Sequence, residues 1–597
     1  MTVLLSRQID RTLTHWLHSL PQQAPAGSQW ELWLFEGLAA RQAAERQLRQ
    51  QGIAARIRSA YKPLVHFFLE EVEDLAQLLR VQVRYPVQPE APANRFRLET
   101  YPLAAMLPQA ELHLVPGDAA PRYQVQLQWR DGRQRSASVP VPCRPVSDAW
   151  GGSAVASCGW VRQLQADGTE VRSEALDTDY AQAFEAAMQA VQQHPWPQAE
   201  PYFGRLLLRI DLPGFEQPVA GTGETMSTTE ALHEELYFGL LAHFQHHSGR
   251  PAGDRRLQPG QMVPDIRCAD DADPLALQHI EVLVETQALQ TAGDEPHDTL
   301  TADHAARALA HVAQAPSIAE VQGFFSPLVQ QHGLLWQGRS RQGRAVGATY
   351  QVGSDRPVLI SGGQHANETS GVVGALRAGL VLAEEPASHF ALLPLENPDG
   401  YALHQWYCRQ APQHMHHAAR YSALGDDIEY RETEPLYERV VRQDALAGSG
   451  AQLHINLHGY PAHEWVHPLT GYIPRGFDLW TLPKGFFLIL RYHAGWQAQA
   501  EQLAEAVTQA LLQVPGLAEY NARQLALYQQ HSGLQPFSLL HGTPYTMAEN
   551  HASPAAMTLI TEFPDETVTG DAFVFAHQAQ LAATLAAYRA WQHIALP

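Results

Sequence analysis

The sequence predicts an α/β protein whose C-terminal part, residues 316–597, holds a mixed, largely parallel sheet flanked by helices. Three apolar segments in this part are typical of buried strands: "PVLIS" at 357–361, "FALLPL" at 390–395 and "AQLHINL" at 451–457. A helical pattern beginning near Glu368 follows the first strand, and buried strands that alternate with helices indicate a parallel core sheet. Ser317 followed by Glu320 is a capping box, which predicts a helix at the start of this part.

The N-terminal half predicts a mixed α+β region in two units. Residues 1–145 contain a strand at 30–36, a helix at 38–51 and a β-hairpin of residues 123–129 and 135–141 around an Asp131-Gly132 turn. Residues 146–315 predict a second α+β domain or extension, with helices at 179–194 and 231–247 and a strand at 204–212. The loop at 251–274, rich in Pro, Gly and Asp, is interpreted as an internal linker.

Composition and charge narrow the class of protein. The 597 residues are 45% hydrophobic and 17% charged, as in an ordinary globular protein. A net charge of −21 argues against a nucleic-acid partner, because a phosphate backbone requires a basic surface. The four cysteines are scattered without a CxxC pair, and no apolar run is long enough to span a membrane. We therefore expect a cytoplasmic protein without a membrane partner; the sequence does not indicate its oligomeric state.

Polar side chains follow two of the predicted strands. His365 and Glu368 come three residues apart after the strand at 357–361, and His458 ends the strand at 451–457. Ligands gather at the carboxyl ends of parallel strands, so these three side chains are expected at one sheet edge. Two imidazoles and one carboxylate, with a position left for water, are the ligand set of a catalytic zinc ion. The sequence thus predicts one zinc ion per chain.

A second histidine pattern nearby predicts no metal site. His463, Glu464 and His467 carry the letters HExxH, which bind zinc only when the two histidines share one face of a helix. Pro461 precedes the pattern and Pro468 follows it, and proline disfavours helical geometry in the residue before it. These residues are expected in a loop at the mouth of the site. The histidines at 243, 246 and 247 are similarly interpreted as the end of a helix.

Five phrases in order resemble the zinc carboxypeptidase (funnelin) family over residues 316–597. They are "GRSRQGR" at 338–344, "GGQHANETSG" at 362–371, "NPDGY" at 397–401, "INLHGY" at 455–460 and "TLITEFPDE" at 558–566. The resemblance implies that His365, Glu368 and His458 are the zinc ligands. It also implies that Glu562 is the general base for water and then the acid toward the leaving amine.

The resemblance further implies residues that contact substrate. Arg409 is expected to stabilise the developing oxyanion and Arg420 to bind the terminal carboxylate of the substrate. The chain departs from the family at Ala419, where an asparagine usually precedes the second arginine. Tyr545 is matched to a mobile active-site tyrosine, and Asn397 is expected among the substrate-binding residues.

The predicted function is that of a zinc metallocarboxypeptidase, a protease-type hydrolase that acts on peptides. One alternative is an amidohydrolase of the aspartoacylase and succinylglutamate-desuccinylase branch, which acts on N-acyl amino acids and resembles the chain at "HANETSGV". Another is a catalytically inactive zinc-binding interaction protein, against which Glu562 and the three ligands argue together. The histidines at 414–417 are expected in a polar loop. The acidic run at 425–434 is interpreted as a solvated face or an attraction for basic substrates.

Overall fold

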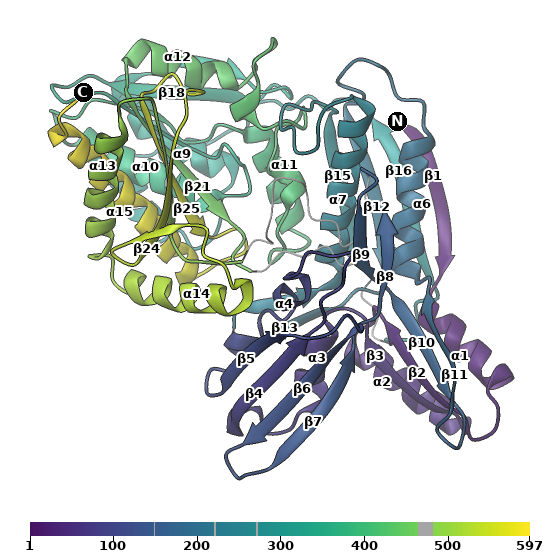
Figure 1. The fold of residues 1–597 in the computed structure, drawn as a ribbon. Helices are drawn as coiled ribbons and strands as arrows, with labels where there is room; N and C mark the ends of the chain where they lie inside the picture. The colour runs from purple at the N-terminus through teal and green to yellow at the C-terminus, as the bar shows by residue number, and fades with distance from the viewer. Residues whose placement is uncertain (148–149, 220–221, 270–272, 464–481) are drawn as a thin grey trace.

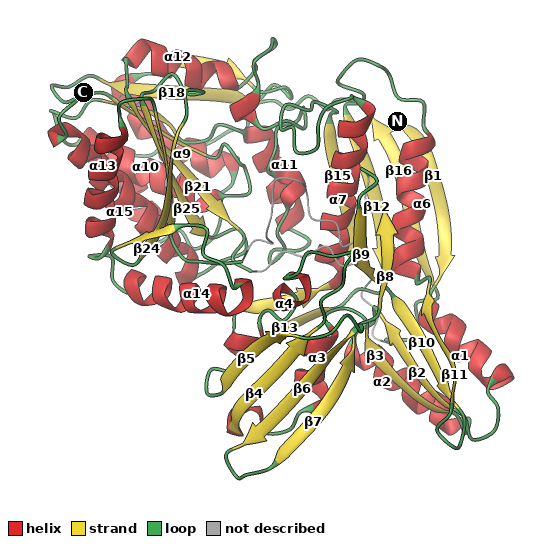
Figure 2. Cartoon of the chain, in the orientation of Figure 1, coloured by secondary structure: helices red, strands yellow, loops and turns green. Residues whose placement is uncertain are grey.

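The computed structural model describes residues 1–147, 150–219, 222–269, 273–463 and 482–597, and Figure 1 shows two regions. A C-terminal α/β unit lies on the left, with the sheets of the N-terminal region to its right and below it. Figure 2 shows helices on both sides of the C-terminal sheet. Among the described residues, no helix combines the length and apolar character that crossing a bilayer requires.

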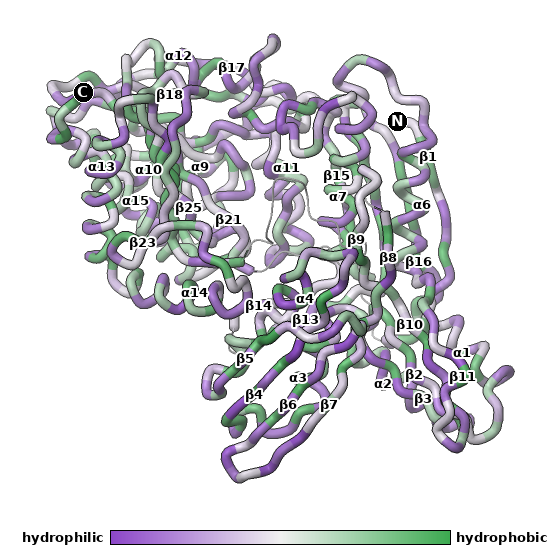
Figure 3. The backbone as a smooth tube through the Cα atoms, in the orientation of Figure 1, coloured by the Kyte–Doolittle hydropathy of each residue, from purple (hydrophilic) through white to green (hydrophobic). Residues whose placement is uncertain are grey.

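The C-terminal unit is organised around a mixed sheet of nine strands within the described residues. In spatial order these are β17 (Trp336–Arg339), β18 (Ala345–Gln351), β20 (Phe390–Leu393), β19 (Val358–Gly362), β21 (Leu453–Tyr460), β25 (Met557–Pro564), β22 (Phe487–Tyr492), β24 (Thr543–Glu549) and β23 (Ser538–Leu540). The four central strands β20, β19, β21 and β25 are parallel. In Figure 3 hydrophobic colour is concentrated along the inner strands, as expected for a sheet covered on both faces.

Helices cover both faces of this sheet. α10 and α13 pack with α15 on one face, and α12 contacts β17 to β20 on the other. The Ser317–Glu320 capping box is present at the start of α9, as predicted. The helices and 3-10 turns of this unit are α8 (Ala302–Leu309), α9 (Ile318–His332), α10 (Thr369–Ala383), α11 (Pro398–Cys408), η2 (His417–Ala419), η3 (Ile428–Tyr430), α12 (Arg439–Ser449), α13 (Gln497–Leu511), α14 (Leu517–Ser532) and α15 (Asp571–His593).

The N-terminal region contains three four-stranded sheets within its described residues. The first is β1 (Thr2–Asp10), β16 (His279–Gln287), β12 (Arg205–Leu212) and β15 (Gln261–Cys268). The second is β11 (Glu170–Leu176), β10 (Gly159–Leu164), β2 (Gln29–Leu34) and β3 (Ala54–Ser59). The third is β5 (Glu111–Pro116), β4 (Leu78–Tyr85), β6 (Arg122–Trp129) and β7 (Gln134–Pro140). Two of these sheets combine strands from either side of residue 145, so the two expected N-terminal units share their sheets.

Shorter elements complete this region. They are the strand pairs β8 (Cys143–Ser147) with β9 (Ser153–Ser157) and β13 (Glu216–Val219) with β14 (Glu224–Ser227), together with α1 (Thr12–Gln23), α2 (Leu38–Gln50), α3 (Pro63–Glu71), η1 (Leu75–Gln77), α4 (Arg95–Leu98), α5 (Leu103–Met106), α6 (Asp179–Gln193) and α7 (Thr228–His247). The predicted helices at 38–51, 179–194 and 231–247 and the hairpin of β6 and β7 are confirmed.

The prediction that residues 251–274 form an internal linker is wrong. Its middle forms β15, which pairs in parallel with β12 and buries its first five residues. Pro264 lies inside that strand, at an edge of the sheet, where the missing N–H costs no ladder hydrogen bond. The composition typical of a loop therefore describes only the flanks of this segment.

One hydrophobic cluster contains residues of both regions. Leu236 and Leu240 of α7 belong to the same buried cluster as Leu403 and Tyr407 of α11 and Met415 beyond it. Helix α7 is buried over most of its length, and it lies beside α11 in Figure 1. The N-terminal region is consequently packed against the segment that leads from α11 into the candidate site.

Candidate metal centre

The candidate metal centre lies where β19 and β21 end side by side. His365 follows β19 in a turn that contains Gly363, whose φ of +66° lies in the left-handed region that favours glycine. Glu368 is the N-cap residue of α10, and His458 lies near the end of β21. All three side chains are buried. The fold therefore brings the three predicted ligands together at the carboxyl edge of the parallel strands.

The ligand atoms are close enough to hold one ion. Nδ1 of His365 lies 3.0 Å from Nδ1 of His458. The Glu368 carboxylate lies 2.9 Å from the first of these nitrogens and 2.8 Å from the second. Ligand atoms around a tetrahedral zinc ion are about 3.3 Å apart, so small side-chain rotations would admit the ion. Two imidazole nitrogens and one carboxylate in a buried turn fit a zinc-class metal.

A further carboxylate orients the first ligand. Asp427 Oδ2 lies 3.2 Å from Nε2 of His365, and its Oδ1 accepts a 3.0 Å hydrogen bond from the Gln364 side chain. A proton on Nε2 leaves Nδ1 free for a metal, which is the usual role of a carboxylate behind a ligating histidine. Burial would raise the pKa of Asp427, but His365 and Arg255 hold it well below its usual range.

The interpretation of the acidic run at 425–434 as a solvated face is wrong for its first two carboxylates. Asp426 and Asp427 are 0% and 1% exposed. Asp426 forms a buried ion pair with Arg431 at 2.7 Å, which fixes the turn that presents Asp427. Sequence reasoning missed Asp427 because its partner His365 lies 62 positions earlier in the chain.

The two predicted arginines lie in different surroundings. The Arg420 guanidinium donates a hydrogen bond to the Glu368 carboxylate, so this arginine reaches the metal centre. Arg409 is the exposed C-cap residue of α11. Burial would raise the pKa of Glu368, but His365, Arg420 and His458 hold it well below its usual range. We therefore assign the position beside the ligands to Arg420, in place of Arg409.

Glu562 lies beside the third ligand. Its Cα is paired with that of His458 across the parallel strands β21 and β25. Directly paired residues point to the same face of a sheet, so the two side chains emerge together. Burial and the Glu368 carboxylate raise the pKa of Glu562 well above its usual range, while Arg420 and Lys484 act in the opposite direction.

A second glutamate, which sequence reasoning missed, is also near the centre. Glu566 Oε2 accepts a 2.7 Å hydrogen bond from Asn367, in the turn between two ligands. Its Oε1 lies 3.9 Å from the Arg420 guanidinium. Glu566 lies four residues after Glu562, in the loop that follows β25. The alternation of side chains along a strand therefore does not predict where its side chain points.

The "NPDGY" phrase has a positioning role in this structure. Asn397 caps α11 by accepting a 2.9 Å hydrogen bond from the Gly400 amide. Its side-chain nitrogen lies 3.5 Å from the carbonyl oxygen of Gln364 and 3.4 Å from that of Arg420. Asn397 is fully buried, so we assign it the task of holding two site loops together instead of contact with substrate.

The neighbouring Asp399 explains the "GRSRQGR" phrase. Its carboxylate accepts hydrogen bonds from the Ser340 hydroxyl at 2.7 Å, the Gln342 amide at 2.9 Å and the Arg344 guanidinium at 2.8 Å. Residues from two of the phrases that carried the family resemblance thus form one polar network around the buried Asp399 carboxylate.

Tyr545 lies in the sheet, and the contacts described for it do not include the candidate ligands. Within β24 it pairs with Leu488 of β22, and it packs against the hydrophobic core of the C-terminal unit.

Lys484, which sequence reasoning missed, lies close to Glu562. Its ammonium lies over the rings of Tyr460 and Phe487, and the Glu562 carboxylate is the charge that raises its pKa. Burial is the stronger effect and lowers the pKa of Lys484 to about 8.

The HExxH pattern falls partly outside the described residues, which include His463 but neither Glu464 nor His467. His463 follows β21, and its Nε2 lies 2.6 Å from the Glu230 carboxylate of α7. Burial would lower the pKa of His463, but Glu230 raises it to about 9. His463 therefore connects the two regions and does not join the three candidate ligands. The histidine cluster at 243–247 ends helix α7, as predicted.

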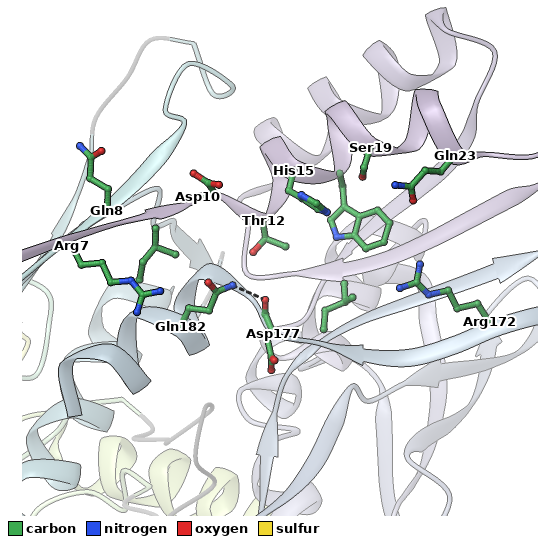
Figure 4. Close-up of a pocket in the computed structure, with 13 residues that line it drawn as sticks. Arg7, Gln8, Asp10, Thr12, His15, Ser19, Gln23, Arg172, Asp177 and Gln182 are labelled. Atoms are coloured by element: carbon green, nitrogen blue, oxygen red, sulfur yellow. Dashed lines mark hydrogen bonds between the residues drawn. The ribbon is translucent and has the colours of Figure 1, made fainter. Parts of the chain in front are cut away.

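A separate pocket of about 540 Å³ lies in the N-terminal region (Figure 4). Its described lining combines Arg7, Asp10 and His15 with Trp16. Asp177 and Gln182 also line it, and the Gln182 amide donates a 3.0 Å hydrogen bond to the Asp177 carbonyl. None of the predicted site residues belongs to this described lining. The pocket is thus distinct from the metal centre.

No family model matches the sequence, and no curated protein matches it either. Several solved structures are similar to part of the chain. A candidate metallopeptidase from Shewanella denitrificans is 17% identical with a TM-score of 0.30, over 46% of this chain and 91% of its own. A metallo-carboxypeptidase from Burkholderia cenocepacia is 16% identical with a TM-score of 0.29, over 52% and 73%. A succinylglutamate desuccinylase from a Silicibacter species is 13% identical with a TM-score of 0.26, over 42% and 65%.

These similarities cover about half of the chain, in keeping with a resemblance confined to one segment. Similarities this low do not assign an activity. The interpretation of the site therefore depends on its own residues and distances.

Proposed function

We propose that the chain is a zinc-dependent hydrolase of metallocarboxypeptidase type, which releases C-terminal residues from short peptides. The observation that carries this proposal is the convergence of three buried ligands, His365, Glu368 and His458, with Arg420 and Glu562 at one strand edge. A structural metal site has no need of an additional base and an additional cation beside its ligands.

The residues divide the chemistry among them. Zinc, when held by the three ligands, supplies Lewis-acid polarisation of a carbonyl and activation of water. Glu562 accepts a proton from the attacking water and returns it to the leaving amine. Arg420 donates hydrogen bonds to the substrate oxygen on which negative charge develops. Asp427 keeps His365 in the tautomer that leaves Nδ1 free.

With Arg420 assigned to the oxyanion, another cation must bind the carboxylate of the substrate. Arg431, the next arginine along the chain, is fully buried in ion pairs with Asp426 and Glu438. We propose Lys484 for this role, because its half-buried ammonium lies close enough to Glu562 for each to shift the pKa of the other. An ammonium in surroundings of low polarity binds a carboxylate more strongly than it would in water.

A panel of short peptides, their C-terminally amidated forms and N-acyl amino acids tests the proposal on the zinc-loaded protein. Amidation should lower kcat/KM at least tenfold, the cost of one charged hydrogen bond of about 1.5–3 kcal/mol. Lys484→Met should abolish the difference between free and amidated peptides.

The panel also separates the alternatives. Cleavage of N-acyl amino acids alone would favour an amidohydrolase, because the same centre and the same cation suit that substrate. Equal cleavage of free and amidated peptides would leave a hydrolase without carboxylate recognition. Zinc binding without cleavage of any member would favour an interaction protein.

A further inference from the structure

A second group of metal-binding side chains lies outside the catalytic centre. His404 and Cys408 are four residues apart on α11 and so share one helix face, and His416 follows eight residues later, just before η2. The two histidines are 3% and 2% exposed, and the cysteine is half-buried. None of the three has a role in the mechanism above.

The three donor atoms form a triangle of the size that one ion requires. Nδ1 of His404 lies 3.4 Å from Nδ1 of His416. Sγ of Cys408 lies 3.8 Å from the first nitrogen and 3.9 Å from the second. Around a tetrahedral zinc ion, with Zn–N bonds of about 2.0–2.1 Å and a Zn–S bond of about 2.3 Å, such atoms are about 3.3–3.6 Å apart. The observed spacing is therefore within a few tenths of an ångström of that geometry.

The three side chains contact one another closely, and Sγ of Cys408 also lies 3.4 Å from Nε2 of His404. Two imidazole nitrogens face each other, and Nε2 of His416 is buried without a hydrogen-bond partner in the described part of the chain. The Tyr407 ring stacks on His416 at 4.9 Å and 17°, which holds the imidazole in place. Two facing imidazole nitrogens share at most one proton between them, whereas one ion can bind both nitrogens and the cysteine sulfur together.

We propose that His404, Cys408 and His416 form a second divalent-metal site, for a zinc-class ion, that fixes the start of the segment carrying Arg420. The site joins the end of α11 to the chain four residues before Arg420. The same stretch is held from the other side by α7, since the Met415 amide donates a 2.7 Å hydrogen bond to Glu230. An ion here would hold the path of this segment and with it the position of the guanidinium.

Cobalt substitution distinguishes this site from the catalytic one. A cobalt–thiolate charge-transfer band in the near ultraviolet requires a sulfur ligand, which the histidines and glutamate of the catalytic centre do not offer. The apoprotein titrated with Co²⁺ should bind two ions per chain and develop this band. One ion per chain without the band would overturn the proposal.

Variants assign the band to residues. Cys408→Ser should remove the band and one equivalent of metal, while the matched control Cys143→Ser, a half-buried thiol of the N-terminal region, should keep both. His458→Ala should lose the catalytic ion and keep the band, so failure of the proposed function and failure of this site give different results. A band that survives Cys408→Ser, with circular dichroism like that of the parent, would also overturn the proposal.

Discussion

Replacing Glu562 by Gln tests the general base most directly. The amide keeps the shape of the side chain but cannot accept the proton of the attacking water. Glu562 is half-buried, emerges beside His458 and remains open to water, whereas Glu566 is 6% exposed. The geometry thus favours the first glutamate as the group that meets the water.

The expected magnitudes differ enough to separate the two glutamates. Loss of a general base costs about 10²- to 10⁴-fold in turnover, or roughly 3–5 kcal/mol. In Glu566→Gln the amide oxygen can still accept the 2.7 Å hydrogen bond from Asn367. That hydrogen bond loses only its charged acceptor, which costs about 1 kcal/mol. The expected fall in turnover is therefore less than about tenfold.

The assay compares kcat of the two variants on the best peptide of the panel, at equal zinc content and with unchanged thermal unfolding. Glu562→Gln should lose at least ten times more activity than Glu566→Gln. The reverse order would refute the reasoning and would move the general base to Glu566.

Three further predictions follow from the same contacts. His458→Ala should lose the catalytic zinc on dialysis while His463→Ala keeps it, because two protein ligands hold the ion weakly; metal analysis showing loss only from His463→Ala would contradict the ligand assignment. Arg420→Ala should lower kcat about 10²- to 10³-fold, the cost of one oxyanion donor, and the exposed Arg409→Ala by less than roughly twofold; equal losses would contradict the exchange of roles. The His463–Glu230 pair should contribute up to about 3 kcal/mol to stability below pH 6.5, and this is lost as pH rises through 9, because folding raises the pKa of His463 from 6.5 to about 9. Urea unfolding of the parent and His463→Gln should converge above that pH, and a constant difference would contradict the pairing.

The ligands and the fold around them were predictable because each depends on a local pattern. His365, Glu368 and His458 each follow an apolar strand, and parallel strands must deliver their ends to one edge. The prolines beside His463 likewise predict no shared helical face for His463 and His467, of which the described residues include only His463. The resemblance predicts the role of general base for Glu562, and the register of β25 with β21 places this residue beside His458.

The residues that were missed depend on the paths of loops. Arg409 and Arg420 lie eleven positions apart, and only the turn after α11 decides which of them reaches Glu368. Asp427 was interpreted as part of a solvated acidic run. No local sequence pattern shows that Arg431 pairs with the neighbouring Asp426 in a buried turn. Lys484 lies in the loop before β22, where no catalytic pattern marks it.

The segment from Cys408 to Asp427 connects these observations. It begins at the second metal cluster, contacts α7 at Met415, reaches the catalytic ligands through Arg420 and ends on the carboxylate that orients His365. Each anchor restricts the same stretch of backbone, and an oxyanion donor is effective only if its position is fixed before the charge develops. Helix α7 contributes one of these anchors from the N-terminal region. That region therefore takes part in arranging the candidate metal centre through packing and hydrogen bonds, and none of its described residues is among the three candidate ligands.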